Sequence, residues 1–519
     1  MPEIKLTEVD LENALHYLDA AGQFMYLPDQ FELKAIELAW DKVKPVLLSV
    51  NLLSYSPSPK VQLIAPKQKF AARPVQIIDP IDLVLLTALG LRLSPVIEDH
   101  RNRLGPDIVH SWRFTLDSEG RPTFTSDWDS WLAQVAARAS SYDFVAKADI
   151  VDFYPRIYLH RLKNALTAIC GTHETNALMR FFEKWANGTS YGIPIGPRIC
   201  GILAEAVLSE VDEFLLSLGF DFVRYVDDYI FFGKSYSACM KALFMLAQRL
   251  QETQGLCLNM AKTKILSVKK FSEELISPAA KSAKSRRKVI NEVFGGDPYA
   301  VKTYENLNPQ QKRLIDSLDL TTSLKEALKP DLIDLPMVKF VLNVLAGLKR
   351  PELVHHVLDS LDVLLPVAEA VSRFISIFAA EQDAIRQVIS SRIMTYIQET
   401  PFVPSYYILW LLEPFVHDAI WNHLADLRNI ARDNREFMVR RQAILAIGKI
   451  GDRSSLLDLR HAIAHANEWE WRAIVYASRS LPKDEREAFW RSLDIPNEWK
   501  LPNLTKKATL EYAKAAARG

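Results

Sequence analysis

Two adjacent aspartates between two apolar runs constrain this chain most. They are Asp227 and Asp228, in the segment FVRYVDDYIFFG of residues 222–233. Runs of β-branched and aromatic residues on both sides predict a tight β-hairpin with the acids at its turn. Neighbouring carboxylates repel each other, so the arrangement favours a counter-charge, most simply a divalent metal ion. A solvated hairpin tip is the alternative for this segment taken alone.

A second apolar run upstream also ends in an acid. Residues 144–155 read FVAKADIVDFYP, which predicts a strand that ends at Asp149. A two-metal site needs carboxylates from separate strands that converge on ions about 3.5–4 Å apart. Asp149 and Asp227 together satisfy that requirement, whereas Asp149 alone would be an ordinary acid at a strand end. The pair therefore favours metal binding over the solvated tip.

The bulk properties allow several domains and exclude few partners. The 519 residues are enough for two or three domains with ample core. Basic and acidic residues balance at 63 each, so the total charge does not support a nucleic-acid partner, although a local basic cleft is compatible with it. Four scattered cysteines predict free thiols in a reducing cytoplasm. With no signal peptide and no apolar stretch near ~18 residues, we expect a cytoplasmic protein without a membrane partner.

The first part of the chain mixes helical and strand patterns. Residues 8–56 have apolar residues at helical spacing, and residues 57–66 contain three prolines and predict a connector. A strand is expected over 75–78, and a long apolar helix over 81–93. Residues 256–268 predict one more pair of strands.

From about residue 300 onward the strand signal disappears and helix follows helix. Residues 441–452 look like the second helix and turn of a HEAT-type repeat, and residues 473–475 repeat that pattern about thirty residues later. We expect residues 286–519 to form an all-α HEAT-like helical-repeat domain, with an irregular helical bundle as the alternative. The basic run 281–288 marks the boundary, as a solvated surface or linker rather than a strand-binding element.

Four ordered motifs resemble those of reverse transcriptases. They begin at Asp149 (DIVDFY), Gly192 (GIPIGP), Tyr225 (YVDD) and Leu258 (LNMAKT). Each motif is weak or moderate alone, but four in the expected order over about half the chain are specific. The resemblance covers roughly residues 60–270. It implies an α+β right-hand polymerase with palm and fingers, in a domain that we place at residues 1–285.

The resemblance implies a two-metal reaction that adds deoxynucleotides to DNA. Its catalytic acids would be Asp149, Asp227 and Asp228, and its metal ligands Asp149, Ile150, Asp227 and Asp228. The cofactor would be two Mg²⁺ ions, with Mn²⁺ as a substitute. We assign Asp152 a structural role, because the first motif of the family varies there.

Further residues match the nucleotide contacts of the family. Tyr154 stands at the sugar-sensing position, which implies selection of deoxynucleotides over ribonucleotides. Arg73, with Lys69 nearby, matches the fingers residues that grip the triphosphate, because the planar fork of arginine suits phosphate oxygens. Lys262 matches the lysine that approaches the leaving pyrophosphate, with Lys264 as its rival.

One motif departs from the family pattern. Templated members carry glutamine in Gly-x-Pro-Gln-Gly, whereas here Ile195 stands between Pro194 and Gly196. The resemblance implies that Pro194, Ile195 and Gly196 contact the nucleotide. An apolar side chain cannot make the polar contact expected there, which argues against ordinary copying of a template. Together with the helical C-terminal part, this identifies the chain as a member of the bacterial abortive-infection reverse transcriptases. That group defends against phage and is associated with protein-primed, template-independent DNA synthesis and with oligomers.

Protein priming requires a hydroxyl that reaches the metals. Tyr17, Tyr26 and Tyr55 lie outside the palm motifs and are candidates, although each reads more simply as a packing residue. The expected partners are dNTPs, a single-stranded DNA product attached to a tyrosine, RNA, and further copies of the chain. Two alternatives stay open: a templated, retron-like enzyme that copies a dedicated RNA, and a non-catalytic RNA-binding scaffold.

Overall fold

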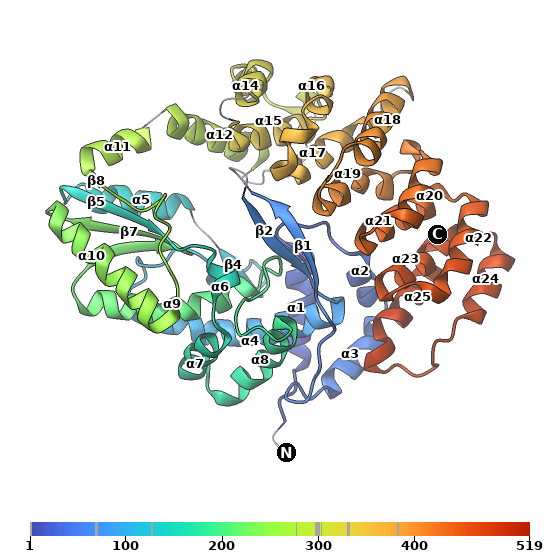
Figure 1. Cartoon of the computed structure of the whole chain (residues 1–519), viewed down its shortest axis with the longest axis horizontal. Coiled ribbons are helices and arrows are strands. Elements are labelled where there is room, and N and C mark those ends of the chain that lie inside the picture. Colours follow the sequence, from blue (N-terminus) through green and yellow to red (C-terminus); the bar gives the residue numbers. More distant parts are fainter. Residues whose placement is uncertain are drawn as a thin grey trace. The chain divides into compact units, whose positions relative to one another are not determined.

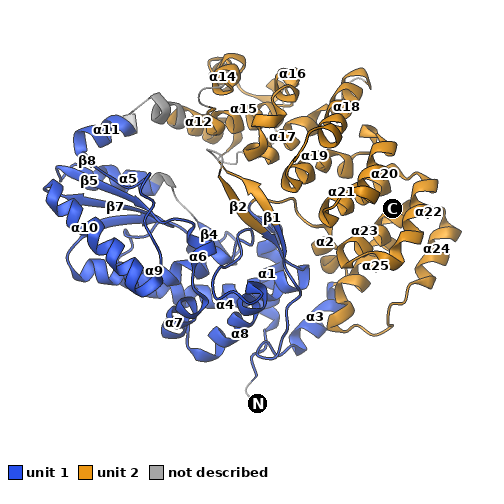
Figure 2. Ribbon diagram, in the orientation of Figure 1, with its two compact units in different colours: residues 1–25, 40–62, 76–280 blue, residues 26–39, 63–75, 281–519 orange. Residues whose placement is uncertain are grey.

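The computed structural model divides into two compact units. It describes residues 3–67, 71–125, 128–276, 278–295, 302, 304–329, 333–380 and 383–518 (Figure 1). Unit 1 comprises residues 1–25, 40–62 and 76–280, and unit 2 comprises residues 26–39, 63–75 and 281–519 (Figure 2).

A four-stranded antiparallel sheet lies at the centre of unit 1. Its order is β6-β7-β5-β8, and its strands are β5 (Phe144–Asp149), β6 (Asp221–Tyr225), β7 (Asp228–Gly233) and β8 (Lys264–Ser267). The predicted hairpin is thus confirmed as β6–β7. Because β5 pairs with β7 and its last residue, Asp149, is opposite Asp228, the end of β5 lies beside the hairpin turn.

Helices cover both faces of this sheet. On one face, Trp131 and Val135 of α5 (Trp128–Ala139) pack against Val145, Val223 and Ile230. The other face carries aromatic rings and contacts α10 (Tyr236–Arg249), which in turn contacts α9 (Cys200–Ser217). Alternation along each strand sends side chains to the two faces in turn, so both faces are apolar and the sheet is buried.

Helix α4 (Pro80–Leu104) is the core of the helical part of unit 1. It packs against α1 (Glu8–Ala21), α7 (Leu159–Cys170), α8 (Thr172–Ala186) and α9. By length and composition α4 could cross a membrane, although Asp82 and Arg92 interrupt its apolar run, as the expectation of no uninterrupted apolar stretch requires. Its most apolar 18-residue window is 83% buried inside the protein, as in a core helix. Unit 1 also contains α3 (Trp40–Ser49), α6 (Phe153–Arg156), η1 (Leu250–Gln254), α11 (Val268–Ile276), β3 (Arg113–Leu116) and β4 (Pro122–Thr125).

Two short hairpins differ from the sequence expectation. Strand β1 (Val61–Pro66) pairs with β2 (Ala72–Ile77), although residues 57–66 were expected to be a connector. The prolines obscured a strand in which buried and exposed side chains alternate. The β3–β4 hairpin was not anticipated. The expected pair over 256–268 is one strand, β8, plus an isolated bridge at Leu258.

Unit 2 is built from successive packed helices. Beyond Ser267, the described residues contain no strand, as predicted. Helices α15, α17, α19, α21, α23 and α25 each pack against the next, and α14, α20 and α22 pack against members of this row. Their bounds are α2 (Phe31–Leu38), α12 (Pro278–Phe294), α13 (Pro309–Asp316), α14 (Leu320–Ala327), α15 (Leu335–Gly347), α16 (Val354–Leu358), α17 (Ala368–Ser376), α18 (Asp383–Glu399), α19 (Ser405–His417), α20 (Leu424–Asp433), α21 (Phe437–Ile450), α22 (Arg453–Ala462), α23 (Glu468–Ala477), α24 (Lys483–Ser492) and α25 (Leu504–Ala516).

Side-chain bridges recur in unit 2 at a separation of about thirty residues. Hydrogen-bonded pairs lie 29, 30, 30 and 32 residues apart in Gln442–Glu413, Arg428–Asp458, Arg440–Glu470 and Arg453–Glu485. Gly448 of α21 lets α23 approach closely, because a Cβ there would lie 2.5 Å from the Cβ of Ala477. Stacked units that contact only their neighbours give this pattern. The HEAT-like assignment itself stays a prediction.

A segment from the N-terminal part of the chain belongs to unit 2. In α2, Glu32 forms a buried ion pair with Arg441 of α21 at 2.7 Å, and the two side chains are 0% and 2% exposed. The neighbouring Phe31 stacks on Tyr476 with ring centroids 4.6 Å apart. No local sequence pattern indicates this long-range packing. The division into domains at residues 285/286 stays a prediction. The compact units differ from it, because α2 belongs to the same unit as the C-terminal helices.

Replacing Arg441 should destabilise unit 2. Arg441→Met leaves the Glu32 carboxylate buried without its partner, which costs about 3–5 kcal/mol. We expect urea denaturation of the full chain, followed by circular dichroism, to show an earlier unfolding transition. The control is Glu485→Gln, which breaks the surface pair with Arg453 and should change the free energy of unfolding by at most about 1 kcal/mol. Similar small shifts in both variants would contradict this account.

Candidate metal centre

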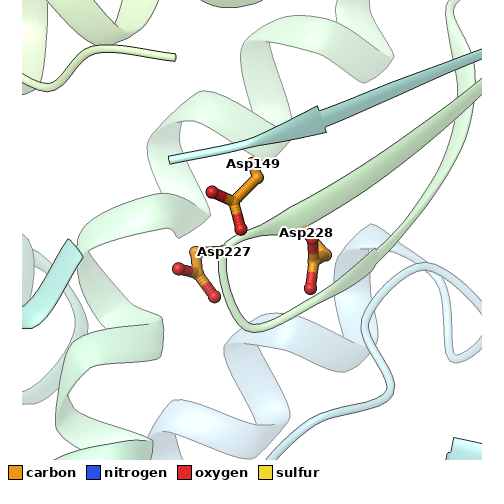
Figure 3. Close-up of side chains that lie close together, drawn as sticks. All are labelled: Asp149, Asp227 and Asp228. Carbon is orange, nitrogen blue, oxygen red and sulfur yellow. The ribbon is translucent and has the colours of Figure 1, made fainter. Parts of the chain in front are cut away.

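Three aspartate side chains converge where β5 ends beside the β6–β7 turn (Figure 3). Carboxylate oxygens of Asp149, Asp227 and Asp228 all lie within 4.8 Å of one another. Asp149 comes from β5, whereas Asp227 and Asp228 come from the turn and the start of β7. Carboxylates on separate strands at this spacing match the donor set that a divalent cation requires.

The environment of Asp227 and Asp228 opposes the ionisation of their carboxyl groups. Burial, followed by the charges of Asp228 and Asp149, raises the pKa of Asp227 from 3.8 to about 7. Burial and the charge of Asp149 raise the pKa of Asp228 to about 6. Like charges that share a half-buried site repel each other, and a cation among them removes that repulsion. The geometry and the charges together fit one or two divalent ions.

Lys262 supplies one positive charge to the cluster. Its ammonium lies 2.6 Å from Oδ1 of Asp149. Burial alone would lower the pKa of Lys262, but the hydrogen bond and the charge of Asp149 outweigh it and raise the pKa. The rival lysine, Lys264, instead pairs with Glu274 at 2.7 Å on the surface. Of these two lysines, the structure brings only Lys262 to the aspartates.

Asn259 orients Asp149 and was missing from the predicted site. Its Nδ2 donates to Oδ2 of Asp149 at 3.1 Å, and its backbone N–H donates to the Asp149 carbonyl at 2.7 Å. Asn259 lies in the LNMAKT motif three residues before Lys262, so the motif offered a signal. The backbone N–H of Ile150 donates to the Asp227 carbonyl at 3.2 Å and ties the strand end to the turn. As a metal ligand Ile150 stays a prediction, and Asp152 is exposed and outside the cluster.

The hairpin turn contains a strained residue. Val226 has φ of 55°, a left-handed conformation that β-branched residues rarely adopt. Two side chains hold its backbone: Oγ of Ser111 accepts from the Val226 N–H at 2.8 Å, and the Arg224 guanidinium donates to the Val226 carbonyl at 2.8 Å. Since Val226 immediately precedes Asp227, these bonds fix the direction in which the hairpin turn presents its acids.

Arg224 is part of a buried network of ion pairs. The guanidinium, 0% exposed, bonds to Asp212 at 2.5 Å and to Glu205 at 2.5 Å, both on α9. Ser111 donates to the same Glu205 at 2.6 Å, which closes the network around Val226. The sequence signal was available: Glu205 and Asp212 are seven residues apart on one face of an apolar helix. Their partner could not be read from the sequence.

Tyr154 lies close enough to Asp227 to sense its charge, and its backbone bonds to the residue before the loop of residues 194–196. Burial, together with the carboxylates of Glu205 and Asp227, raises the pKa of Tyr154 well above its ordinary value. The Ile193 N–H donates to the Tyr154 carbonyl at 3.1 Å, which connects the loop to α6. The predicted sugar-sensing role of Tyr154 is not tested by these contacts.

Gln76 holds the loop that departs from the family pattern. Its side-chain oxygen accepts from the Ile195 N–H at 2.6 Å, and its own N–H donates to the Ile195 carbonyl at 2.8 Å. Gly196 has φ of 136°, and a Cβ there would lie 2.8 Å from the Gln76 carbonyl oxygen. Pro194 is buried and the Ile195 side chain is half-buried. Polar contacts to this loop thus reach its backbone from Gln76, a residue absent from the predicted site.

The other predicted residues that the structure describes have partners within their own unit. Arg73 belongs to unit 2, where it donates to the Tyr26 hydroxyl at 2.7 Å, and Lys69 lies outside the described residues. Tyr17 is 3% exposed, and burial raises its pKa to about 12. The Tyr55 hydroxyl donates to Asp82 at 2.5 Å. These surroundings favour packing roles for Tyr17 and Tyr55.

Weakening the support of the hairpin should weaken metal binding. Arg224→Lys keeps the charge but cannot hold Asp212, Glu205 and the Val226 carbonyl at once. Loss of such support around metal ligands typically lowers affinity by about 10–100-fold. Mn²⁺ titration followed by electron paramagnetic resonance measures the affinity. Arg138→Lys, at the partly exposed pair with Asp221, is the control and should bind as the unmodified protein does. Equal affinities for both variants would contradict the positioning role.

Metal binding should compete with protons. The raised pKa values of Asp227 and Asp228 exceed their ordinary value of 3.8, so the metal-free fold loses stability as pH rises from about 4 through 7. Mg²⁺ binds the ionised form and should therefore raise the unfolding temperature more at pH 8 than at pH 5. Differential scanning calorimetry of the protein and of Asp227→Asn tests this, and the variant should lose most of the difference. An equal Mg²⁺ effect at both pH values would refute it.

Comparisons with known proteins identify the fold around the cluster. Residues 66–292 match the family described as "Reverse transcriptase (RNA-dependent DNA polymerase)". No curated protein matches the chain. Similar solved structures include apo telomerase from Candida tropicalis truncated from its C-terminal domain, with 14% identity, 49% of this chain and 54% of that chain covered, and a TM-score of 0.27.

Two further telomerase structures are similar. Apo telomerase from Candida tropicalis has 11% identity, covers 79% of this chain and 76% of that chain, and has a TM-score of 0.31. Telomerase from Candida albicans in complex with a fragment of telomeric RNA has 11% identity, covers 94% of this chain and 71% of that chain, and has a TM-score of 0.29. This chain spans about half the length of the first telomerase structure, and superpositions this loose carry no argument. The family match and the acid cluster together show that residues 66–292 form a reverse transcriptase domain, a polymerase domain of the nucleotidyltransferase type.

Proposed function

We propose that this chain is a DNA polymerase that adds deoxynucleotides without a conventional template and primes on its own tyrosine, in bacterial antiphage defence. The single observation that carries the proposed chemistry is the half-buried cluster of Asp149, Asp227 and Asp228 inside the residues that match reverse transcriptases. A non-catalytic scaffold has no need for three mutually repelling carboxylates held this closely.

The residues of the cluster would each do one task. Asp149 and Asp227 would hold two Mg²⁺ ions, with Asp228 beside them, and bound Mg²⁺ supplies activation of a hydroxyl and neutralisation of phosphate charge. Asn259 fixes the Asp149 carboxylate. Lys262 brings an ammonium group that can turn from Asp149 to the leaving pyrophosphate, since its side chain is 56% exposed. Tyr154 would lie under the sugar and exclude a 2′-hydroxyl.

One observation supports synthesis without a template, and a second supports priming on a tyrosine. Ile195 offers no polar side-chain contact, and the backbone around it is already bonded to Gln76, so the usual polar contact of templated enzymes is missing. In unit 2 the Tyr26 hydroxyl lies 2.7 Å from the Arg73 guanidinium, which is the group expected to grip a triphosphate. Of the three priming candidates, Tyr26 is therefore favoured. The helical repeats of unit 2 would supply contacts for further copies of the chain.

The test is incubation of the purified chain with labelled dNTPs and Mg²⁺ and no added nucleic acid. We expect label to remain on the protein in a denaturing gel, and Asp227→Asn to lower incorporation by several orders of magnitude because the charge is lost while the shape is kept. Tyr26→Phe should abolish attachment to protein, with Tyr55→Phe as the matched control. DNA that forms only with an added RNA template and primer would favour the retron-like alternative, and RNA binding without synthesis the scaffold.

Selection of the sugar should depend on Tyr154. Tyr154→Ala removes the ring expected under the sugar, so the ratio of kcat/KM for dNTPs to kcat/KM for rNTPs should fall by about tenfold or more. Tyr154→Phe keeps the ring and should keep the ratio. Steady-state kinetics with both nucleotide types measures it. An unchanged ratio in Tyr154→Ala would make Tyr154 a packing residue.

A further inference from the structure

Two exposed tyrosines lie together on the surface of unit 1. Tyr158 follows the segment that carries Tyr154, and Tyr191 precedes the loop of residues 194–196. Tyr158 and Tyr191 are 37% and 41% exposed, and their ring centroids are 6.1 Å apart. An isolated β-bridge joins their backbones, and the exposed His160 lies edge-on to Tyr158 at 5.5 Å. Because all three belong to described parts of unit 1, their arrangement relative to the catalytic aspartates is fixed by the same unit.

The Tyr158 ring packs against a glycine with a left-handed backbone conformation. The π-helical turn η1 ends at Gly255, which has φ of 67°. A Cβ at Gly255 would lie 2.8 Å from the Tyr158 ring, so glycine is needed for the ring to rest there. Single π-helical turns are frequent at functional sites. The ring is thus exposed on the surface yet fixed in position, which lowers the entropy lost when a flat ligand stacks on it.

The two sequence segments that carry the rings contain basic residues and no acidic ones. The segments 153–173 and 184–204 contain no Asp or Glu, although acids make up 63 of the 519 residues. They carry Arg156, Arg161 and Lys163 near Tyr158, and no carboxylate in the described parts of the chain pairs with any of these three. The backbone N–H of Arg161 donates to the Tyr158 carbonyl at 3.0 Å, so its side chain starts within one turn of the ring.

We propose that Tyr158 and Tyr191, with the unpaired basic side chains beside them, form a platform that binds a single nucleic-acid strand next to the catalytic centre. Bases stack on exposed aromatic rings whatever their sequence, and basic side chains neutralise the phosphates between them. The inference rests on the proposed polymerase function, because it names where a strand, product DNA or an RNA, lies as it leaves or enters the site. A solvated pair of surface tyrosines would not need basic residues without acids on both of its segments, or a glycine against which the ring rests.

The test measures binding without synthesis. The protein is full-length Asp227→Asn, so that no attached product occupies the platform. Fluorescence anisotropy measures its binding to fluorescein-labelled dT20 or rU20 in the presence of EDTA. We expect each of Tyr158→Ala and Tyr191→Ala to weaken binding roughly 5- to 100-fold, and Tyr158→Trp to keep it. Arg161→Gln should lower the slope of log affinity against log salt by about 1. Preference for dT20 assigns the platform to the DNA product, and preference for rU20 to an RNA.

The matched control is Tyr236→Ala, another tyrosine of unit 1 that is 54% exposed, on α10. It should bind as the parent does. Unchanged binding in both platform variants, or an equal loss in Tyr236→Ala, would overturn the proposal. Thermal unfolding of each variant confirms that it folds, and the Trp variant separates lost stacking from lost structure. Because the assay contains no metal or dNTP, failed DNA synthesis would refute the proposed function and leave this result standing.

Discussion

The hairpin that carries Asp227 and Asp228 depends on one buried guanidinium. Arg224 joins α9 to the turn of the sheet, because it bonds at once to Asp212, to Glu205 and to the carbonyl of the strained Val226. A buried charge left without its partners is strongly destabilising, so these groups hold one another in place. The left-handed turn, and hence the direction of Asp227, persists because the network around it over-determines it. The metal centre is therefore built from helix α9 as much as from the two strands that carry the acids.

The chemistry of the centre follows from its surplus of negative charge. Asp227 and Asp228 are partly buried and have raised pKa values, and Lys262 compensates only Asp149 directly. Such a site gains most from a cation, and its affinity for one is set by how firmly the carboxylates are oriented. Asn259 and Ile150 orient Asp149 and the turn through hydrogen bonds of 2.7 to 3.2 Å.

The sequence predicted the parts of the fold and site that have a local signature. The β6–β7 hairpin, the convergence of Asp149 on Asp227, and the helical C-terminal part all follow from periodicity and motif spacing. The β1 strand was missed because its prolines resemble a connector. Arg224 with Glu205, Gln76 with Ile195, and α2 with Arg441 were missed because each pairs residues from distant segments, for which single-sequence patterns carry no signal.

The central claim is that the three aspartates bind the metal ions of a polymerase. A crystal structure of the full chain with Mn²⁺ and a non-hydrolysable dNTP analogue, with data collected for the anomalous signal of manganese, tests it most directly. The account predicts two anomalous peaks about 3.5–4 Å apart between Asp149 and Asp227. It also predicts that the Lys262 ammonium leaves Asp149 for the phosphates. Manganese bound elsewhere, with Lys262 still on Asp149 and no peak at the aspartates, would contradict it.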